Sequence, residues 1–286
     1  LNSAFSARLI RDTEVETVFQ DAIHIMAKEA GFPEGIKIRI VLNPSYNAFV
    51  VGGDTVYIHT GLLLSARSAE EILGVIAHEI GHLAAGHAPL RQEAVDDANL
   101  ATALAALATA AVAATGSTDA AIGVAIGGTD RAKRQYLSKS RKDESVADEW
   151  ALKLLDKAGI SSHGLTDFMR RQASQSLFPE SRQSEYYSTH PGAKDRLATF
   201  TDHTALITED RALSQIEQQR LARAVLKLAA YIQPPSATKE LKFQLDWTRS
   251  LVDQTKIVPN KKSLTYARAI TLFRRGELNA ANKLIS

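Results

Sequence analysis

The segment His78-Glu79-Ile80-Gly81-His82 carries two histidines four residues apart, with a glutamate directly after the first. It follows Ser68-Ala69-Glu70-Glu71, a pattern typical of the capped start of a helix. On a helix, residues four apart lie one above the other on the same face, so both imidazoles can bind one Zn²⁺. The glutamate between them can hold and deprotonate a metal-bound water. The spacing therefore predicts a hydrolytic zinc site rather than two surface histidines.

A catalytic zinc needs a third protein ligand and an open fourth position. His87 is the nearest candidate, but on a continuous helix it lies about 140° round from His82 and faces elsewhere. Ala85 and Ala88 stand where the metzincin form of this motif requires Gly and His, which excludes that class.

Glu144 is the better candidate for the third ligand, and Asp148 lies four residues further along the same predicted helix. An aspartate one turn along can accept a hydrogen bond from a ligating imidazole and fix its tautomer. Asp143 and Glu149 flank this face and fit less well. Taken alone, the acidic pair is also typical of an ordinary solvated helix face.

The elements that position these residues are predicted from hydrophobic periodicity and turn residues. We expect a helix over 13–30, strands over 37–42, 47–51 and 55–59, and the metal helix from Ser68 to about His87. Further helices are expected over 143–157 and near 163–175, then a loop with Tyr186, Tyr187 and His190. After residue 208 only helices are expected, over 208–231, 238–254, 263–275 and 277–286. The fold class is therefore α+β, mainly α.

Composition excludes several classes of protein. The chain has 286 residues, of which 45% are hydrophobic and 23% charged, as in ordinary globular proteins. It has no cysteine, which excludes disulfides, thiolate zinc sites, iron–sulfur clusters and cysteine nucleophiles. A formal net charge of +2 gives no support to nucleic-acid binding.

The stretch Ala98–Thr118 contains no charged residue, and its length alone permits a membrane span. It consists mostly of Ala and Thr with few large apolar side chains. We therefore expect a helical cover near the catalytic cleft and no transmembrane span. Peripheral membrane contact is the intermediate interpretation.

The pair of segments His78–His82 and Glu144–Asp148 resembles metallopeptidase family forty-eight, the HtpX-like and CAAX-protease-like gluzincins. Further segments are similar to the family in the same order: Asn47-Ala48-Phe49, Thr60-Gly61-Leu62-Leu63, and Ser188-Thr189-His190-Pro191 with Arg196. Residues 266–281 resemble the start of a tetratricopeptide array. The similarity is greatest to the soluble periplasmic branch with C-terminal repeats.

The resemblance implies one Zn²⁺ per chain, held by His78, His82 and Glu144, with Glu79 as general base. It implies that His190 either steadies the tetrahedral oxyanion or occupies the open metal position in a resting state. Tyr186 and Tyr187 are alternative oxyanion donors that the sequence does not rank. Asp148 and Arg196 are expected to support the ligands.

Asn47, Ala48 and Phe49 are expected, by the same resemblance, to form an edge strand that pairs with an extended substrate. The alternative interpretation is that these three residues form an ordinary core strand.

The predicted organisation is a zincin-like metallopeptidase domain with a small β-sheet over 1–205, followed by an all-α, repeat-like tail over 206–286 that continues past Ser286 in the natural protein. The function that the resemblance implies is cleavage of unfolded or misassembled envelope proteins in the periplasm, with a chaperone-like role. Expected partners are polypeptide substrates and, through the tail, envelope protein-assembly machinery. The alternative is a latent protease or zinc-containing scaffold that acts mainly by binding partners.

Overall fold

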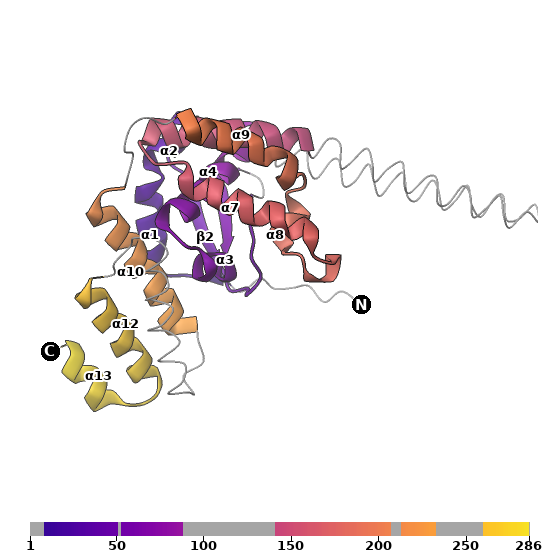
Figure 1. Cartoon of the computed structure of the whole chain (residues 1–286). Helices are drawn as coiled ribbons and strands as arrows, with labels where there is room; N and C mark the ends of the chain where they lie inside the picture. Colours follow the sequence, from indigo (N-terminus) through magenta and orange to yellow (C-terminus); the bar gives the residue numbers. More distant parts are fainter. Residues whose placement is uncertain (1–8, 51–52, 88–140, 207–212, 233–259, 286) are drawn as a thin grey trace, which may run out of the picture.

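The computed structural model describes residues 9–50, 53–87, 141–206, 213–232 and 260–285 (Figure 1). The described chain is mainly helical and contains one four-stranded sheet, as predicted. Ala98–Thr118 and the helix expected over 238–254 lie outside the described residues. Of the helices that are described, none is both long and apolar enough to cross a membrane.

The sheet has the strand order β1-β2-β4-β3 and is mixed. Strands β2 (Lys37–Val41) and β4 (Thr55–His59) are parallel, whereas β1 (Leu9–Ile10) and β3 (Ala48–Val50) pair antiparallel on the outside. The three predicted strands are therefore confirmed, and β3 forms one edge of the described sheet. Strand β1 was not predicted, because two residues are too few to show a period of two.

The helix predicted over 13–30 is two helices, α1 (Thr13–Ala22) and α2 (His24–Glu29). Their apolar positions share one periodic pattern, but the backbone leaves helical geometry at Ile23, where φ is −100° and ψ is 2°. Both helices contribute buried side chains to the core beneath the sheet.

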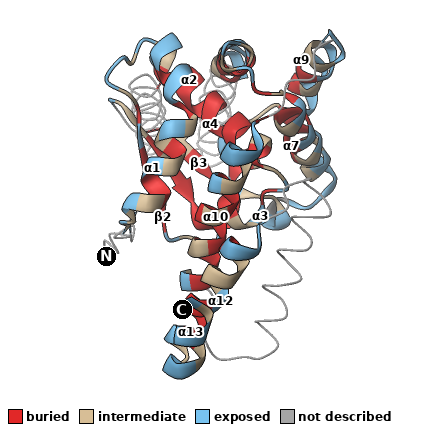
Figure 2. Cartoon of the chain, turned by 90° about the vertical axis from the view of Figure 1, so that its left-hand side faces the viewer, coloured by how far each residue is buried: buried red, intermediate tan, exposed pale blue. Residues whose placement is uncertain are grey.

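Strand β4 leads through α3 (Thr60–Ser65) into α4 (Ala69–Ala84), the central buried helix (Figure 2). The Ser68 hydroxyl caps α4 by accepting from the backbone N–H of Glu71 at 2.9 Å. The Glu71 carboxylate does not complete the expected capping box. Its Oε2 accepts instead from the backbone N–H of Arg67, one residue before the cap, at 3.1 Å, while its Oε1 accepts from the Tyr46 hydroxyl at 2.9 Å and from the Arg171 guanidinium.

Helix α4 ends at Ala84, three residues before the predicted end at His87. Ala85 is the C-terminal cap, and Gly86 follows with φ +69°, the left-handed conformation that commonly terminates helices. The prediction that the helix continues to His87 is therefore wrong. Gly86 ends the helix before the chain reaches Pro89, the residue that was expected to end it.

The helix predicted over 143–157 covers residues 141–158 in the described chain and is followed by α7 (His163–Ser174). The segment expected to be a loop contains the short turns η1 (Gln175–Leu177) and η2 (Glu180–Arg182) and the helix α8 (Glu185–Thr189). Helix α9 (Ala193–Leu206), which packs along α7, was not predicted. Its buried stripe is narrow, with only Ala193, Arg196 and Phe200 buried, so its periodicity is weak.

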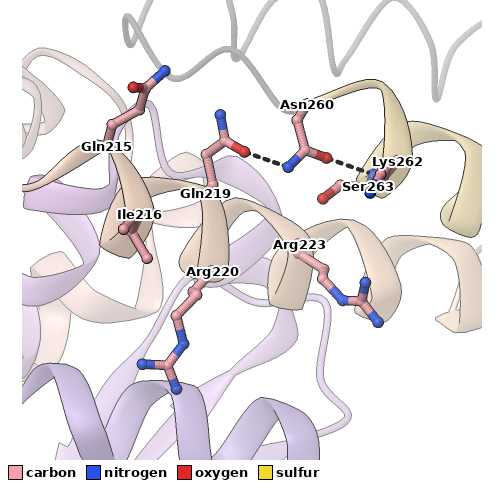
Figure 3. Close-up of a pocket in the computed structure, with 8 residues that line it drawn as sticks. All are labelled: Gln215, Ile216, Gln219, Arg220, Arg223, Asn260, Lys262 and Ser263. Carbon is pink, nitrogen blue, oxygen red and sulfur yellow. Dashed lines mark hydrogen bonds between the residues drawn. The ribbon is translucent and has the colours of Figure 1, made fainter.

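The tail forms the helices α10 (Gln215–Ile232), α12 (Lys261–Arg274) and α13 (Leu278–Ile285), which confirms the tail helices predicted within the described residues. Helix α10 packs against α1, and α12 packs against α10 (Figure 1). At the groove between α10 and α12, the Asn260 amide donates to Gln219 and its oxygen accepts from the backbone N–H of Ser263 at 2.8 Å (Figure 3). Asn260 thus caps α12 and ties its first turn to α10.

Candidate metal centre

Three predicted ligand atoms converge from two helices. In α4, Nε2 of His78 lies 3.1 Å from Nε2 of His82. From the helix over 141–158, Glu144 places Oε2 3.2 Å from His78 Nε2 and Oε1 3.4 Å from His82 Nε2. With bonds of 2.0–2.1 Å, the ligand atoms of a tetrahedral zinc stand about 3.3 Å apart. The donor set and its spacing therefore fit a divalent metal such as Zn²⁺.

The close approach of the two helices depends on Gly81. A Cβ atom added at Gly81 would lie 2.6 Å from the backbone oxygen of Ala147. Real Cβ atoms do not come so near a carbonyl oxygen, so any larger residue would push the helices apart. The glycine between Glu79 and His82 thereby sets the distance at which Glu144 meets the histidines.

Asp148 and Arg196 support the ligands from the other side. Nδ1 of His78 lies 2.9 Å from Oδ1 of Asp148. The Arg196 guanidinium donates twice to Asp148, at 2.6 Å each, and once to Glu144, at 2.8 Å. All these side chains are buried, so a charge-assisted network holds the third ligand and orients the first histidine.

The electrostatics of this network favour a cation at the centre. Burial raises the pKa of Glu144, but interactions with His190 and Arg196 outweigh burial and hold the pKa well below its usual range. Burial lowers the pKa of His78, but its hydrogen bonds to Asp148 and Glu144 raise the pKa to about 9. Ionised carboxylates therefore surround the position where the three donor atoms meet.

Glu79 is fully buried beside the ligands, and Nε2 of His190 lies 3.2 Å from its Oε1. Burial raises the pKa of Glu79, but interaction with His190 and the ligand histidines outweighs burial and lowers the pKa. Neither Glu79 oxygen makes a well-oriented hydrogen bond within the described chain. Glu79 is thus an ionised carboxylate with free acceptor capacity beside the metal ligands.

His190 comes from the C-terminal end of α8, and its ring stacks on Tyr186 with centroids 4.0 Å apart. One of its ring atoms belongs, with atoms of His78, His82 and Glu144, to a group of donors that lie within 4.8 Å of one another. This position is compatible with both expected roles, as oxyanion donor and as fourth ligand. The Tyr186 hydroxyl is also buried and has no hydrogen-bond partner among the described residues, whereas Tyr187 is half-buried.

His87 lies against the ligands, contrary to the sequence argument. Because α4 stops at Ala84, the chain turns at Gly86 and brings Nδ1 of His87 to 2.9 Å from Nδ1 of His82. The 140° argument assumed a helix that continues, and its conclusion that His87 faces elsewhere is wrong. The signal that could have found this residue is Gly86 itself, one position before the histidine.

The predicted substrate-binding segment lies at the sheet edge and next to α8. Asn47 precedes β3 and donates to the Glu185 carboxylate at 3.0 Å. Asn47 and Ala48 are buried, and Phe49 is half-buried with its ring stacked on Tyr57. Strand β3 also packs on α4. The edge position meets the geometric requirement for strand pairing, and the binding role itself stays a prediction.

The central helix carries two histidine donors and a glutamate, and a second helix brings a carboxylate to the same position. This arrangement is typical of zinc-dependent metallopeptidases. The model of peptidase family M48 matches residues 10–204. The chain therefore belongs to peptidase family M48, whose members use a divalent metal.

Several curated proteins that are similar to this chain are named as proteases. A candidate beta-barrel assembly-enhancing protease of Vibrio cholerae is 27% identical over 252 residues, covering 86% of this chain and 49% of the relative. Metalloprotease YcaL of Escherichia coli is 30% identical over 170 residues, covering 59% of this chain and 63% of the relative. The beta-barrel assembly-enhancing protease of E. coli is 25% identical over 159 residues, covering 56% of this chain and 32% of the relative. The chain thus spans less than two thirds of the length of each of these relatives.

Proposed function

We propose that the chain is a zinc-dependent endopeptidase that hydrolyses peptide bonds. The observation that supports this most is the donor set of His78, His82 and Glu144 beside a buried, ionised Glu79 whose oxygens have free acceptor capacity. A structural zinc site has no use for such a carboxylate, because all four of its positions are closed.

A zinc ion held by His78, His82 and Glu144 would supply a Lewis acid that polarises the scissile carbonyl and lowers the pKa of the attacking water. Glu79 accepts the proton of that water at a carboxylate oxygen and returns it to the leaving amine. Among the described residues, His190 Nε2 and the Tyr186 hydroxyl are buried donors without a well-oriented hydrogen bond, and both are available to the developing oxyanion.

The test compares Glu79→Gln with the wild-type chain. The variant should retain one zinc per chain, since all ligands remain, and should lose cleavage of an unfolded protein by at least 100-fold, since the base is gone. Glu149→Gln, at an exposed position of the helix that carries Glu144, is the matched control and should change neither property. Wild-type cleavage by Glu79→Gln would contradict the proposal.

We further propose that the substrates are unfolded or misassembled envelope proteins and that the chain acts in the periplasm. The names of relatives that enhance β-barrel assembly support this proposal. The edge strand β3, with Asn47, Ala48 and Phe49, offers backbone pairing to an extended substrate. The helical tail is the proposed contact with assembly machinery, in keeping with a chaperone-like role.

A latent form is the second candidate, because His190 shares the donor group with the three ligands. If His190 occupies the fourth position in the resting protein, His190→Ala should raise cleavage above the wild-type rate. If His190 only donates to the oxyanion, the same change should slow turnover. The cleavage rate of this one variant separates the two roles.

A further inference from the structure

We propose that His87 is a positioning residue of the metal centre: it accepts a hydrogen bond from Nδ1–H of His82 and thereby keeps Nε2 of His82 unprotonated, with its lone pair directed at the metal position. This inference rests on the proposed zinc site and adds a residue to it.

The geometry places the two rings in direct contact. Nδ1 of His82 and Nδ1 of His87 are 2.9 Å apart, and the ring centroids are 5.2 Å apart with the planes inclined at 62°. His82 is fully buried and His87 is 5% exposed. At this distance one nitrogen donates and the other accepts, since two protonated nitrogens would repel.

The direction of the hydrogen bond follows from the ligand group. Nε2 of His82 lies 3.1 Å from His78 Nε2 and 3.4 Å from Glu144 Oε1, so Nε2 is the atom that faces the metal position. A ligating nitrogen needs its lone pair, so the proton of neutral His82 is on Nδ1. His82 is therefore the donor and His87 the acceptor.

The two ligand histidines consequently have different supports. Nδ1 of His78 faces the carboxylate of Asp148, which carries a full negative charge. Nδ1 of His82 faces the His87 ring, which is neutral when it accepts a hydrogen bond. This contact therefore fixes the tautomer of His82 without adding negative charge. The site already holds the carboxylates of Glu79, Glu144 and Asp148. Partners of this kind typically raise metal affinity by 10–100-fold.

The other nitrogen of His87 must then carry its proton. Nε2 of His87 lies 3.9 Å from Oδ1 of Asp143, which is too long for a direct hydrogen bond and suits one bridging water. Asp143, which the sequence placed beside the ligand face, thus completes a chain from His82 through His87 to a carboxylate.

Three substitutions at position 87 test the acceptor role. In His87→Asn, the amide oxygen lies the same number of bonds from Cα as Nδ1, so the acceptor is kept. His87→Leu fills the same space with a methyl group and removes the acceptor. His87→Gln moves the oxygen to the position of Nε2. His163→Asn, at an exposed histidine, is the control.

The measurements are the zinc dissociation constant from competition with a chelator, the melting temperature of the zinc-free protein, and cleavage. His87→Leu and His87→Gln should bind zinc on the order of 10–100-fold more weakly, and His87→Asn should stay within about threefold of the wild type. The zinc-free melting temperatures of His87→Asn and His87→Gln should agree, so that affinity and not folding separates them.

Unchanged zinc affinity in His87→Leu or His87→Gln overturns the inference, and so does an equal loss in His87→Asn and His87→Gln. If His87→Leu does not fold, the comparison of Asn with Gln decides. Wild-type protein that binds no zinc overturns the proposed function and this inference together. Wild-type protein that binds zinc and cleaves, with unchanged affinity in the variants, overturns the inference alone.

Discussion

Several buried polar atoms at the candidate metal centre make no well-oriented hydrogen bond within the described chain: both oxygens of Glu79, the Tyr186 hydroxyl and Nε2 of His190, which lies 3.2 Å from Glu79 Oε1. Leaving such a group unsatisfied costs about 1–3 kcal/mol of folding free energy. All these atoms lie beside the donors of the metal position. Water and substrate bound there would satisfy their hydrogen-bonding capacity.

The variant Tyr186→Phe separates the cost of the buried hydroxyl to stability from its contribution to catalysis. The Phe ring keeps the stacking on His190 and the edge-to-face contact with Phe168, and only the hydroxyl is lost. The free energy of unfolding should rise by about 1 kcal/mol, because an unsatisfied buried group disappears. Turnover should fall by about tenfold if the hydroxyl donates to the oxyanion. Urea unfolding measures the stability and peptide cleavage measures the turnover, with Tyr187→Phe as the control. A Tyr186→Phe protein that is less stable and has unchanged turnover would contradict the prediction.

Glu144 and Asp148 should differ in their effects on zinc. Glu144→Ala removes a ligand atom and should abolish stoichiometric zinc binding. Asp148→Asn keeps the shape of the side chain that faces His78 and should weaken the affinity by about 10–100-fold. Metal analysis after dialysis against a weak chelator distinguishes the two variants. Full zinc occupancy in Glu144→Ala would refute its assignment as third ligand.

At the scale of elements, the centre depends on how closely α4 approaches the helix over 141–158. In Gly81→Ala, the added methyl carbon would lie 2.6 Å from the backbone oxygen of Ala147, closer than real Cβ atoms approach an oxygen. Separation of the helices should cost about 1–3 kcal/mol of stability and weaken zinc binding by moving Glu144 away from the histidines. Thermal unfolding and a zinc titration measure both effects.

The control for this prediction is Val146→Ala, at an exposed position of the same helix as Glu144. It should leave zinc binding unchanged. If Gly81→Ala lowered stability but not zinc affinity, the close approach would serve packing alone.

At the scale of the whole molecule, ion pairs join the tail helix α10 to α1. Lys227 lies 2.8 Å from carboxylate oxygens of Asp12 and Glu14, and Nε of Arg223 lies 2.6 Å from Glu14. Burial raises the pKa of Glu14, but Lys227 and Arg223 outweigh burial and lower the pKa below 4.5. The stabilisation is therefore present above pH 4.5 and is lost as the pH falls through the folded pKa.

Glu14→Gln should accordingly lower the melting temperature at about pH 7, and the difference from the wild type should shrink at about pH 3. Glu29→Gln, at an exposed position of α2, is the control and should show no such dependence. A difference that is constant across this pH range would show that Glu14 acts through packing rather than charge.

Prediction from the sequence was most successful where the relevant contacts are local. His78, Glu79 and His82 share one helix, so their common face follows from backbone geometry within five residues. The same holds for the three predicted strands. Glu144 was proposed as a ligand because Asp148 follows it at helical spacing, and its carboxylate oxygens lie 3.2 and 3.4 Å from the histidine nitrogens.

Contacts between elements were decided only by the tertiary structure. Helix α9 shows little periodicity because few of its side chains are buried, yet it carries Arg196 to the ligand network. Extending α4 to His87 ignored the left-handed turn at Gly86, and that turn is what brings His87 to His82. The sequence by itself determined which residues could bind a metal, since spacing along a helix fixes their faces. The packing of the helices determined which residues support those metal-binding residues, because packing brings together atoms that are far apart in the chain.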